Sequence, residues 1–234
     1  GYQTEGVYIH LGIQGDDAYS DQSMNYAQQF ANLREIKLHV VDIKKQYAES
    51  IPEISLRTKR GREKPCSVCG LIKRYILNQT AVNENFDVLV TAHNLDDETA
   101  ILLANTLDWS LDHLARGEPV LPKTPGFSKK AKPFCRIYER EAAAYTILSG
   151  IEFVREECPC SVGNKQLFHK KHLNEWEDES PGTKLRFYLK YLAALEKGAF
   201  PKRQDSAENL RHQLCPNCGY PTSTDGLCAF CRLF

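Results

Sequence analysis

Four of the nine cysteines in the chain lie near its end, in two Cys-x-x-Cys pairs. The pairs are Cys215 with Cys218 and Cys228 with Cys231, and the stretch between them is polar and rich in turn residues. Two such pairs can offer four thiolates to one tetrahedral ion, and a site closed by four cysteines is structural rather than catalytic. The spacing therefore predicts a structural zinc site, in preference to free thiols or two disulfides.

Two short cysteine motifs lie further upstream. Cys66 and Cys69 form a Cys-x-x-Cys pair at the predicted start of a helix, and Cys158 and Cys160 form a Cys-x-Cys motif. A helix start lowers the pKa of a thiol, and Lys73 follows one turn later, so the first pair suits redox chemistry or a soft metal. Three cysteines from two segments could hold an iron–sulfur cluster with one open iron, or zinc with an open position. An inert pair of helix cysteines is the simpler alternative.

Acid–base groups are concentrated in the segment 91–98, directly after a predicted buried strand. The side chains there that could transfer protons or bind cations are His93, Asp96, Asp97 and Glu98. The alternative is structural: Asn94 or Asp96 caps the following helix, whose dipole stabilises acidic residues in the first turn. Composition alone favours the cap.

The predicted elements that must position these residues alternate between strands and helices. This order indicates an α/β fold with a parallel sheet. The predicted strands cover 6–13, 37–43 and 87–92, and the predicted helices cover 20–34, 69–84, 95–107, 138–149, 165–179 and 180–195. Residues 46–65, rich in cations, and 118–133, rich in prolines, are predicted loops. Ligands of such sheets bind beyond the carboxyl ends of the strands, where the segment 91–98 lies.

The chain has 30 Lys and Arg against 30 Asp and Glu, so its formal net charge of zero gives no overall attraction to nucleic acid. Basic side chains cluster at 57–64, at 129–132 and at Lys170–Lys171. Each cluster is most simply a solvated face, but together they suggest patches for a polyanion. No apolar run is long enough to span a membrane and no secretion signal is found, so we expect a cytoplasmic protein. Cys135 is expected to be a small buried residue.

These motifs follow one another in a recognisable order. They are Cys66-x-x-Cys69-Gly with Lys73-Arg74, Ala92-His93-Asn94-x-Asp96-Asp97, Lys132-Pro133-Phe134, Glu157-Cys158-Pro159 and the terminal four cysteines. Together they resemble the TtuA-type tRNA 2-thiolation enzymes of the PP-loop ATPase superfamily over essentially the whole chain. The stretch Cys-Gly-Leu-Ile-Lys-Arg looks closest to the branch that acts on 5-methyluridine 54, and relatives that act on the wobble uridine share most of the layout.

The resemblance implies an enzyme, an ATP-dependent tRNA sulfurtransferase with a Rossmann-like (HUP-like) fold. In this family ATP adenylates the C2 oxygen of a tRNA uridine, and sulfur transferred through an iron–sulfur cluster displaces AMP. The resemblance implies that Cys66, Cys69 and Cys158 bind a [4Fe-4S] cluster. Lys73 and Asp97 match positions near the ATP phosphates and the reaction centre, where Asp97 either holds magnesium or orients the uridine. The residues expected beside the nucleotide are Tyr8, Ile9, Ala92 and His93.

The same resemblance implies cofactors and partners. The cofactors are the [4Fe-4S] cluster, zinc, and ATP with magnesium. The partners are tRNA and a ubiquitin-like sulfur-carrier protein that ends in a thiocarboxylate, and the family suggests a homodimer. No membrane partner is expected.

The sequence departs from the family pattern in three places. The family's Ser-Gly-Gly-x-Asp-Ser phosphate loop does not occur in the 234 residues, a family glycine is replaced by Ala92, and Cys160 is unexpected. We therefore expect an N-terminally truncated PP-loop domain over 1–200, a linker over 201–214 and a zinc module over 215–234. This piece alone is expected to be inactive. The alternatives are a non-catalytic, zinc-stabilised tRNA-binding module and a redox protein that uses Cys66 and Cys69.

Overall fold

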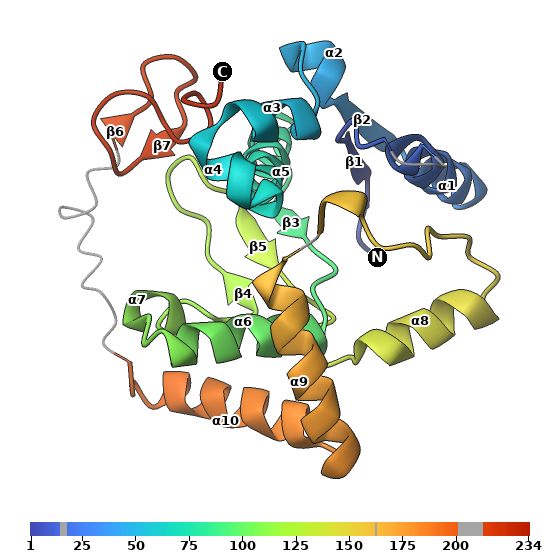
Figure 1. Cartoon of the computed structure of the whole chain (residues 1–234), viewed down its shortest axis with the longest axis vertical. Coiled ribbons are helices and arrows are strands. Elements are labelled where there is room, and N and C mark those ends of the chain that lie inside the picture. Colours follow the sequence, from blue (N-terminus) through green and yellow to red (C-terminus); the bar gives the residue numbers. More distant parts are fainter. Residues whose placement is uncertain (15–17, 162, 201–212) are drawn as a thin grey trace.

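A computed structural model describes residues 1–14, 18–161, 163–200 and 213–234 of the chain (Figure 1). Figure 1 shows the helices α6, α7, α9 and α10 gathered at one end of the molecule and the strands β6 and β7 beside α3–α5 at the other. Among the helices in the described ranges, none combines the length and the apolar character that a bilayer crossing requires.

The first two strands form a parallel pair. β1 (Gly6–His10) pairs with β2 (Leu38–Asp42), and α1 (Tyr19–Leu33) makes the crossover that parallel pairing needs. Both strands are shorter than predicted. Beyond β1 the chain turns at Gly12, whose φ is +65°, and a Cβ there would lie 2.7 Å from Cβ of Ser50. The close approach of the Ser50 segment therefore requires glycine at this turn.

The predicted loop over 46–65 is wrong, because this segment is helical. It contains α2 (Ile43–Tyr47), α3 (Ile51–Arg57) and α4 (Lys59–Glu63). The Ser50 hydroxyl accepts from the Glu53 backbone N–H, and the Glu53 carboxylate accepts from the Ser50 N–H at 2.6 Å. This Ser-x-x-Glu capping box can be read in the sequence. Thr58 caps the next helix with its side chain alone, which accepts from the Gly61 N–H.

The predicted loop over 118–133 is also wrong, because it contains two strands of a three-stranded sheet. β5 (Lys129–Ala131) is central, parallel to β3 (Val88–Val90) and antiparallel to β4 (Val120–Leu121). Lysine has a low strand propensity, but backbone pairing on both sides of β5 outweighs it. Burial, together with the charges of Arg74 and Lys132, lowers the pKa of Lys130.

The long helix α5 (Pro65–Asn83) joins the two groups of strands. Its buried face, which includes Val68, Ile72 and Ile76, packs in the larger hydrophobic core. The fully buried Asn78 donates to the Gly126 carbonyl at 2.9 Å and accepts from the Ser128 N–H at 3.0 Å, which ties the helix to the connection between β4 and β5.

The predicted helices of the second half are confirmed within a few residues. They are α6 (Leu95–Leu107), α8 (Glu139–Leu148), α9 (Lys165–Glu179) and α10 (Thr183–Glu196), with a short α7 (Leu111–Leu114) and a 3₁₀ turn, η1 (Pro159–Ser161). Leu95, Leu102, Leu114 and Tyr188 form a second core, in which the buried Cys135 also lies as predicted. The α/β class with parallel strand pairs is therefore confirmed, although β1–β2 and β3–β5–β4 are hydrogen-bonded separately in the described part of the chain.

The C-terminal segment forms a small antiparallel hairpin, β6 (Gln213–Leu214) with β7 (Pro221–Thr222). Residues 201–212 of the predicted linker lie outside the described residues. Its last two residues form β6 and pair with β7, so they belong structurally to the hairpin that carries the cysteines. The boundaries 1–200, 201–214 and 215–234 otherwise stay predictions.

Candidate functional site

The four C-terminal cysteines form a compact group of sulfur atoms. The sulfur atoms of Cys215, Cys218, Cys228 and Cys231 all lie within 4.8 Å of one another. The Cys218 and Cys228 sulfurs are 3.7 Å apart, close to the spacing of about 3.8 Å that four ligands at 2.3 Å around one tetrahedral zinc would have. These residues therefore fit a structural zinc ion.

Backbone and amide N–H groups surround the same sulfur atoms. The Cys228 N–H donates to the Cys215 sulfur at 3.3 Å, and Asn217 donates to the Cys231 sulfur at 3.4 Å. Burial acts to raise the pKa of Cys215, but N–H donors from Cys228, Cys218 and Asn217 outweigh it and lower the pKa to about 6. Donors that favour a thiolate are what a metal-binding cysteine turn supplies.

The cysteine hairpin packs against α5 and α2 rather than standing apart. The rings of Tyr75 and Phe230 are stacked with centroids 3.6 Å apart, and Tyr47 stacks on Phe234 at 4.6 Å. Arg57 donates to the Leu233 carbonyl at 2.6 Å. The two cysteine turns therefore share the larger hydrophobic core with α5, the helix that carries Cys66 and Cys69.

The structure brings the other two cysteine motifs together. Cys66 and Cys69 occupy the first turns of α5, and Cys158 and Cys160 lie at η1 beside them. The Cys66 thiol donates to the Cys160 carbonyl at 3.5 Å, and the Asn164 amide donates to the Cys66 sulfur at 3.8 Å. Burial raises the pKa of Cys160, and so do the neighbouring thiols of Cys158, Cys69 and Cys66.

In the described residues these four cysteines do not form a group as tight as the C-terminal one. That difference fits the chemistry, because a cluster of four irons spreads its ligand sulfurs over a larger volume than one zinc ion does. The assignment of Cys66, Cys69 and Cys158 to a [4Fe-4S] cluster stays a prediction.

The prediction that the helix start lowers the thiol pKa is wrong for this pair. Burial raises the pKa of Cys66 and of Cys69, and it outweighs the opposing charge of Lys73. The Lys73 side chain itself is exposed on α5. Tyr19, the first residue of α1, packs against the same hydrophobic core as Cys69 and Cys158. Burial, followed by the charge of Cys158, raises the pKa of Tyr19.

The remaining predicted nucleotide-site residues lie within β1 and just beyond β3. Tyr8 donates its hydroxyl to the Ser20 carbonyl at 2.9 Å, and Ile9 packs against the larger core. Ala92 and His93 are exposed beyond β3, with the His93 Nδ1 2.8 Å from the Thr91 hydroxyl. In the part of the chain that the structure describes, no hydrogen bond or ion pair joins these two sets of residues.

The predicted helix cap at Asn94 is confirmed. The Asn94 side chain accepts from the Asp97 N–H at 2.9 Å, and the Asp97 carboxylate accepts from the Asn94 N–H at 3.1 Å. Asp97 is therefore half of a capping box as well as a candidate catalytic residue.

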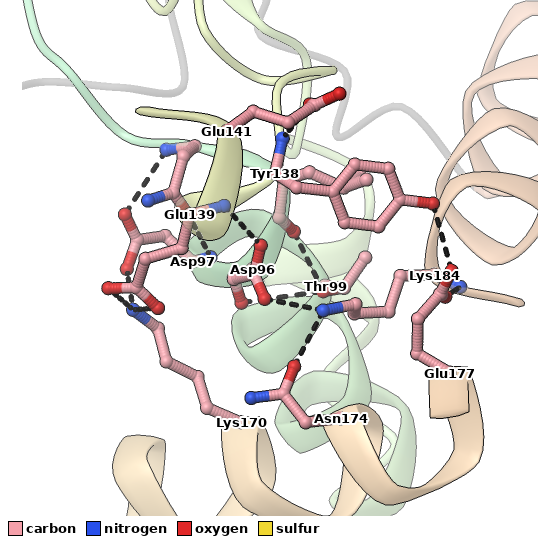
Figure 2. Close-up of polar contacts among 12 residues, drawn as sticks. Asp96, Asp97, Thr99, Tyr138, Glu139, Glu141, Lys170, Asn174, Glu177 and Lys184 are labelled. Carbon is pink, nitrogen blue, oxygen red and sulfur yellow. Dashed lines mark hydrogen bonds and ion pairs between the residues drawn. The ribbon is translucent and has the colours of Figure 1, made fainter. Parts of the chain in front are cut away.

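A network of ion pairs surrounds this helix start, and sequence reasoning missed it (Figure 2). Asp96 pairs with Lys184 at 2.5 Å, Asp97 with Lys170 at 2.8 Å, and Glu98 with Lys132 at 2.8 Å. Each partner is distant in sequence, and no local pattern links the two members of a pair. The basic clusters read from the sequence include Lys132 and Lys170, but they do not show which carboxylates these lysines contact.

Comparisons with known proteins place these sites in context. No protein-family model matches the chain. It is 44% identical, over its whole length and 69% of the relative, to the tRNA-5-methyluridine(54) 2-sulfurtransferase of Thermus thermophilus. The corresponding enzyme of Pyrococcus horikoshii is 41% identical over the whole chain and 71% of the relative.

A solved structure has the same fold. The U34-tRNA thiolase NcsA of Methanococcus maripaludis, described with its [4Fe-4S] cluster, superposes with a TM-score of 0.75 at 25% identity and covers 97% of this chain and 68% of its own. These likenesses confirm the predicted fold class and the predicted resemblance. The chain belongs to the family of the tRNA-5-methyluridine(54) 2-sulfurtransferases.

Proposed function

We propose that the chain replaces the C2 oxygen of a tRNA uridine by sulfur, and that the target is 5-methyluridine 54. The observation that carries the proposal is the full-length likeness to three sulfurtransferases named for that nucleoside, at 38% to 44% identity. The meeting of the two upstream cysteine motifs at α5 supports it, because a sulfurtransferase needs a site that handles sulfur.

The proposed reaction has two steps. The uridine C2 oxygen attacks the α-phosphorus of ATP, so that an O–P bond forms and pyrophosphate leaves with magnesium. A sulfide sulfur then attacks C2, and the C2–O bond breaks to release AMP. The second step needs a sulfur source, for which we propose a carrier protein ending in a thiocarboxylate. A homodimer is part of the same proposal.

The cysteines are proposed to divide between two metal sites. Cys66, Cys69 and Cys158 would hold a [4Fe-4S] cluster, which when bound offers an open iron for a sulfur ligand. Cys215, Cys218, Cys228 and Cys231 would hold zinc, whose role is structural.

The polar residues near α5 and α6 are proposed to act on ATP and uridine. The ammonium of Lys73 would stabilise negative charge that develops on the phosphates. Asp97 would lie near the reacting uridine, as a magnesium ligand or as a hydrogen-bond acceptor. Tyr8, Ile9, Ala92 and His93 would lie beside the nucleotide.

A nucleoside assay tests the proposal. Because the 234 residues alone are expected to be inactive, the chain is first fused behind the phosphate-loop segment of a relative. The fused protein is reconstituted anaerobically with iron and sulfide and incubated with ATP, magnesium, a sulfide source and tRNA, and the digested nucleosides are identified by mass spectrometry. We expect a 2-thio derivative of 5-methyluridine, which disappears when the tRNA carries cytidine at position 54.

A second target is the wobble uridine, because the solved relative is a U34-tRNA thiolase. It would be favoured if the product survived cytidine at position 54 but disappeared with cytidine at position 34. Tight tRNA binding without any thiolated nucleoside would instead support a non-catalytic tRNA-binding module.

A further inference from the structure

Three consecutive acidic residues at the start of α6 each have their own lysine. Lys184 of α10 pairs with Asp96, Lys170 of α9 pairs with Asp97, and Lys132 next to β5 pairs with Glu98. In sequence such an acidic run suggests a site for a divalent cation. In the structure three ammonium groups already supply the positive charge.

Lys170 lies between two carboxylates from different helices (Figure 2). Its ammonium is 2.8 Å from Asp97 Oδ1 and 3.1 Å from Glu139 Oε1, and only 13% of its side chain is exposed. The Glu139 side chain is half-exposed. Its backbone is fixed at the start of α6, because the Glu139 N–H donates to Asp96 Oδ2 at 2.8 Å. Lys170 is thus fixed by α6 and by the first residue of α8.

Both oxygens of Asp97 have a partner. Oδ2 accepts from the Asn94 N–H, and Oδ1 faces Lys170. A carboxylate has about four lone-pair sites, so each oxygen keeps room for one more hydrogen bond. The Lys170 ammonium already lies 2.8 Å from Oδ1. A magnesium ion bound to the same oxygen would be repelled, because it would lie within a few ångströms of that positive charge. Asp97 Oδ1, which the Lys170 ammonium already holds, therefore does not fit magnesium.

We propose that Lys170 is a positioning residue that takes the place of a metal ion beside Asp97, and that Asp97 serves the reaction as an acceptor that orients the uridine. The proposal rests on the proposed function. Of the two roles proposed for Asp97, magnesium ligand and hydrogen-bond acceptor, it selects the second, because the cation beside this carboxylate is the Lys170 ammonium. Magnesium would then enter with the phosphates of ATP only.

Kinetics of three variants test the role, each made in the fusion with a relative's phosphate-loop segment that the nucleoside assay uses. Lys170→Met leaves Asp97 without its cation, and we expect turnover to fall about 100-fold, as when a group at a reacting centre is misplaced. The KM for tRNA should change little, and Lys170→Arg should restore much of the turnover. Lys190→Met makes the same change at an exposed lysine of α10 and should behave like the parent chain.

The magnesium dependence separates the two roles of Asp97. We expect Asp97→Asn to lower turnover while leaving the magnesium concentration for half-maximal rate within about twofold. A rise of about tenfold or more in that concentration would show that Asp97 binds magnesium and would overturn the proposal. So would Lys170→Met turning over as fast as Lys190→Met.

A readout without activity keeps the two proposals apart. The side-chain NMR signal of Lys170 in the isotope-labelled chain, assigned with Lys170→Arg, should move in Asp97→Asn and stay unmoved when magnesium chloride is added without ATP. A signal that shifts with magnesium would show the ammonium being displaced and would overturn the inference, whether or not the chain thiolates tRNA. If the fused protein showed the expected signals but gave no thiolated product, that result would count against the proposed function instead.

Discussion

The ammonium of Lys184 donates to Asp96 Oδ1 at 2.5 Å, and about 5% or less of either side chain is exposed. The same ammonium donates to Asn174 at 2.6 Å and lies 5.1 Å from the centre of the Tyr138 ring. This buried pair joins α10 to the start of α6, directly beside Asp97 (Figure 2).

Breaking the pair from one side is expected to destabilise the fold. Lys184→Met leaves the Asp96 carboxylate buried without a cation, and we expect a loss of about 3–5 kcal/mol in the free energy of unfolding, measured with urea. Adding Asp96→Asn should recover part of that loss, because the second change removes the uncompensated charge. The exposed control Lys190→Met should stay within about 0.5 kcal/mol of the parent chain. Equal losses in Lys184→Met and the control would contradict this account.

A pH dependence is expected from Glu177. Burial acts to raise its pKa, but donors from the Lys184 and Gly182 N–H groups and the Tyr138 hydroxyl outweigh burial, so the pKa lies below its ordinary value of 4.5. The unfolded chain then binds a proton at pH values where the folded Glu177 does not. The stabilisation that Glu177 gives the fold is fully present at pH values above its ordinary pKa. It is lost as the pH falls through the lowered pKa of the folded state.

The measurement is the free energy of unfolding from neutral pH down to the acid limit of the fold. Glu177→Gln should flatten the fall in stability at the acid end, while Glu179→Gln, an exposed neighbour on α9, should leave the slope as it was. An unchanged slope in Glu177→Gln would show that another carboxylate governs acid unfolding.

Zinc removal is expected to reach beyond the C-terminal hairpin. Cys228→Ala removes a buried ligand, and metal analysis should find the zinc content falling from about one ion per chain to none. Because Phe230 stacks on Tyr75 of α5, the near-ultraviolet circular dichroism should weaken too. Cys135→Ala, a buried cysteine in the other core, should keep its zinc. Retention of zinc by Cys228→Ala would disprove the four-cysteine site.

The sequence predicted what depends on local patterns. Helices such as Lys165–Glu179 were placed correctly because caps and apolar spacing lie within one element. The predicted loop in the cation-rich segment before Pro65 is wrong for another reason. Its Ser50–Glu53 capping box is a local pattern that already indicates a helix start in the sequence. β5 could not be predicted in this way, because only pairing with two distant strands makes a strand of Lys129–Ala131.

The candidate site shows the same division. The spacing of Cys66 and Cys69 favoured redox chemistry or a soft metal, which stays a prediction. The expected low thiol pKa was wrong, because burial depends on how η1 packs over α5. The acidic run at Asp96 and Asp97 was visible, whereas its lysine partners come from α9 and α10. Long-range pairing decides whether such a run binds a metal ion, and a single sequence does not display it.

The two cysteines at η1 give the sharpest test of the upstream site. After anaerobic reconstitution with iron and sulfide, we expect a broad visible absorption and bound iron in the parent chain. Both should vanish in Cys66→Ala, Cys69→Ala and Cys158→Ala but survive in Cys160→Ala. The proposed site consists of three thiolates and one open iron, so a fourth thiolate is not needed. Cys160 contacts Cys66 through its backbone carbonyl, which accepts from the Cys66 thiol and which Cys160→Ala keeps. If Cys160→Ala lost its iron and Cys158→Ala kept it, Cys160 rather than Cys158 would be the third ligand. If all four variants kept their iron, these cysteines would not be the ligands of the cluster.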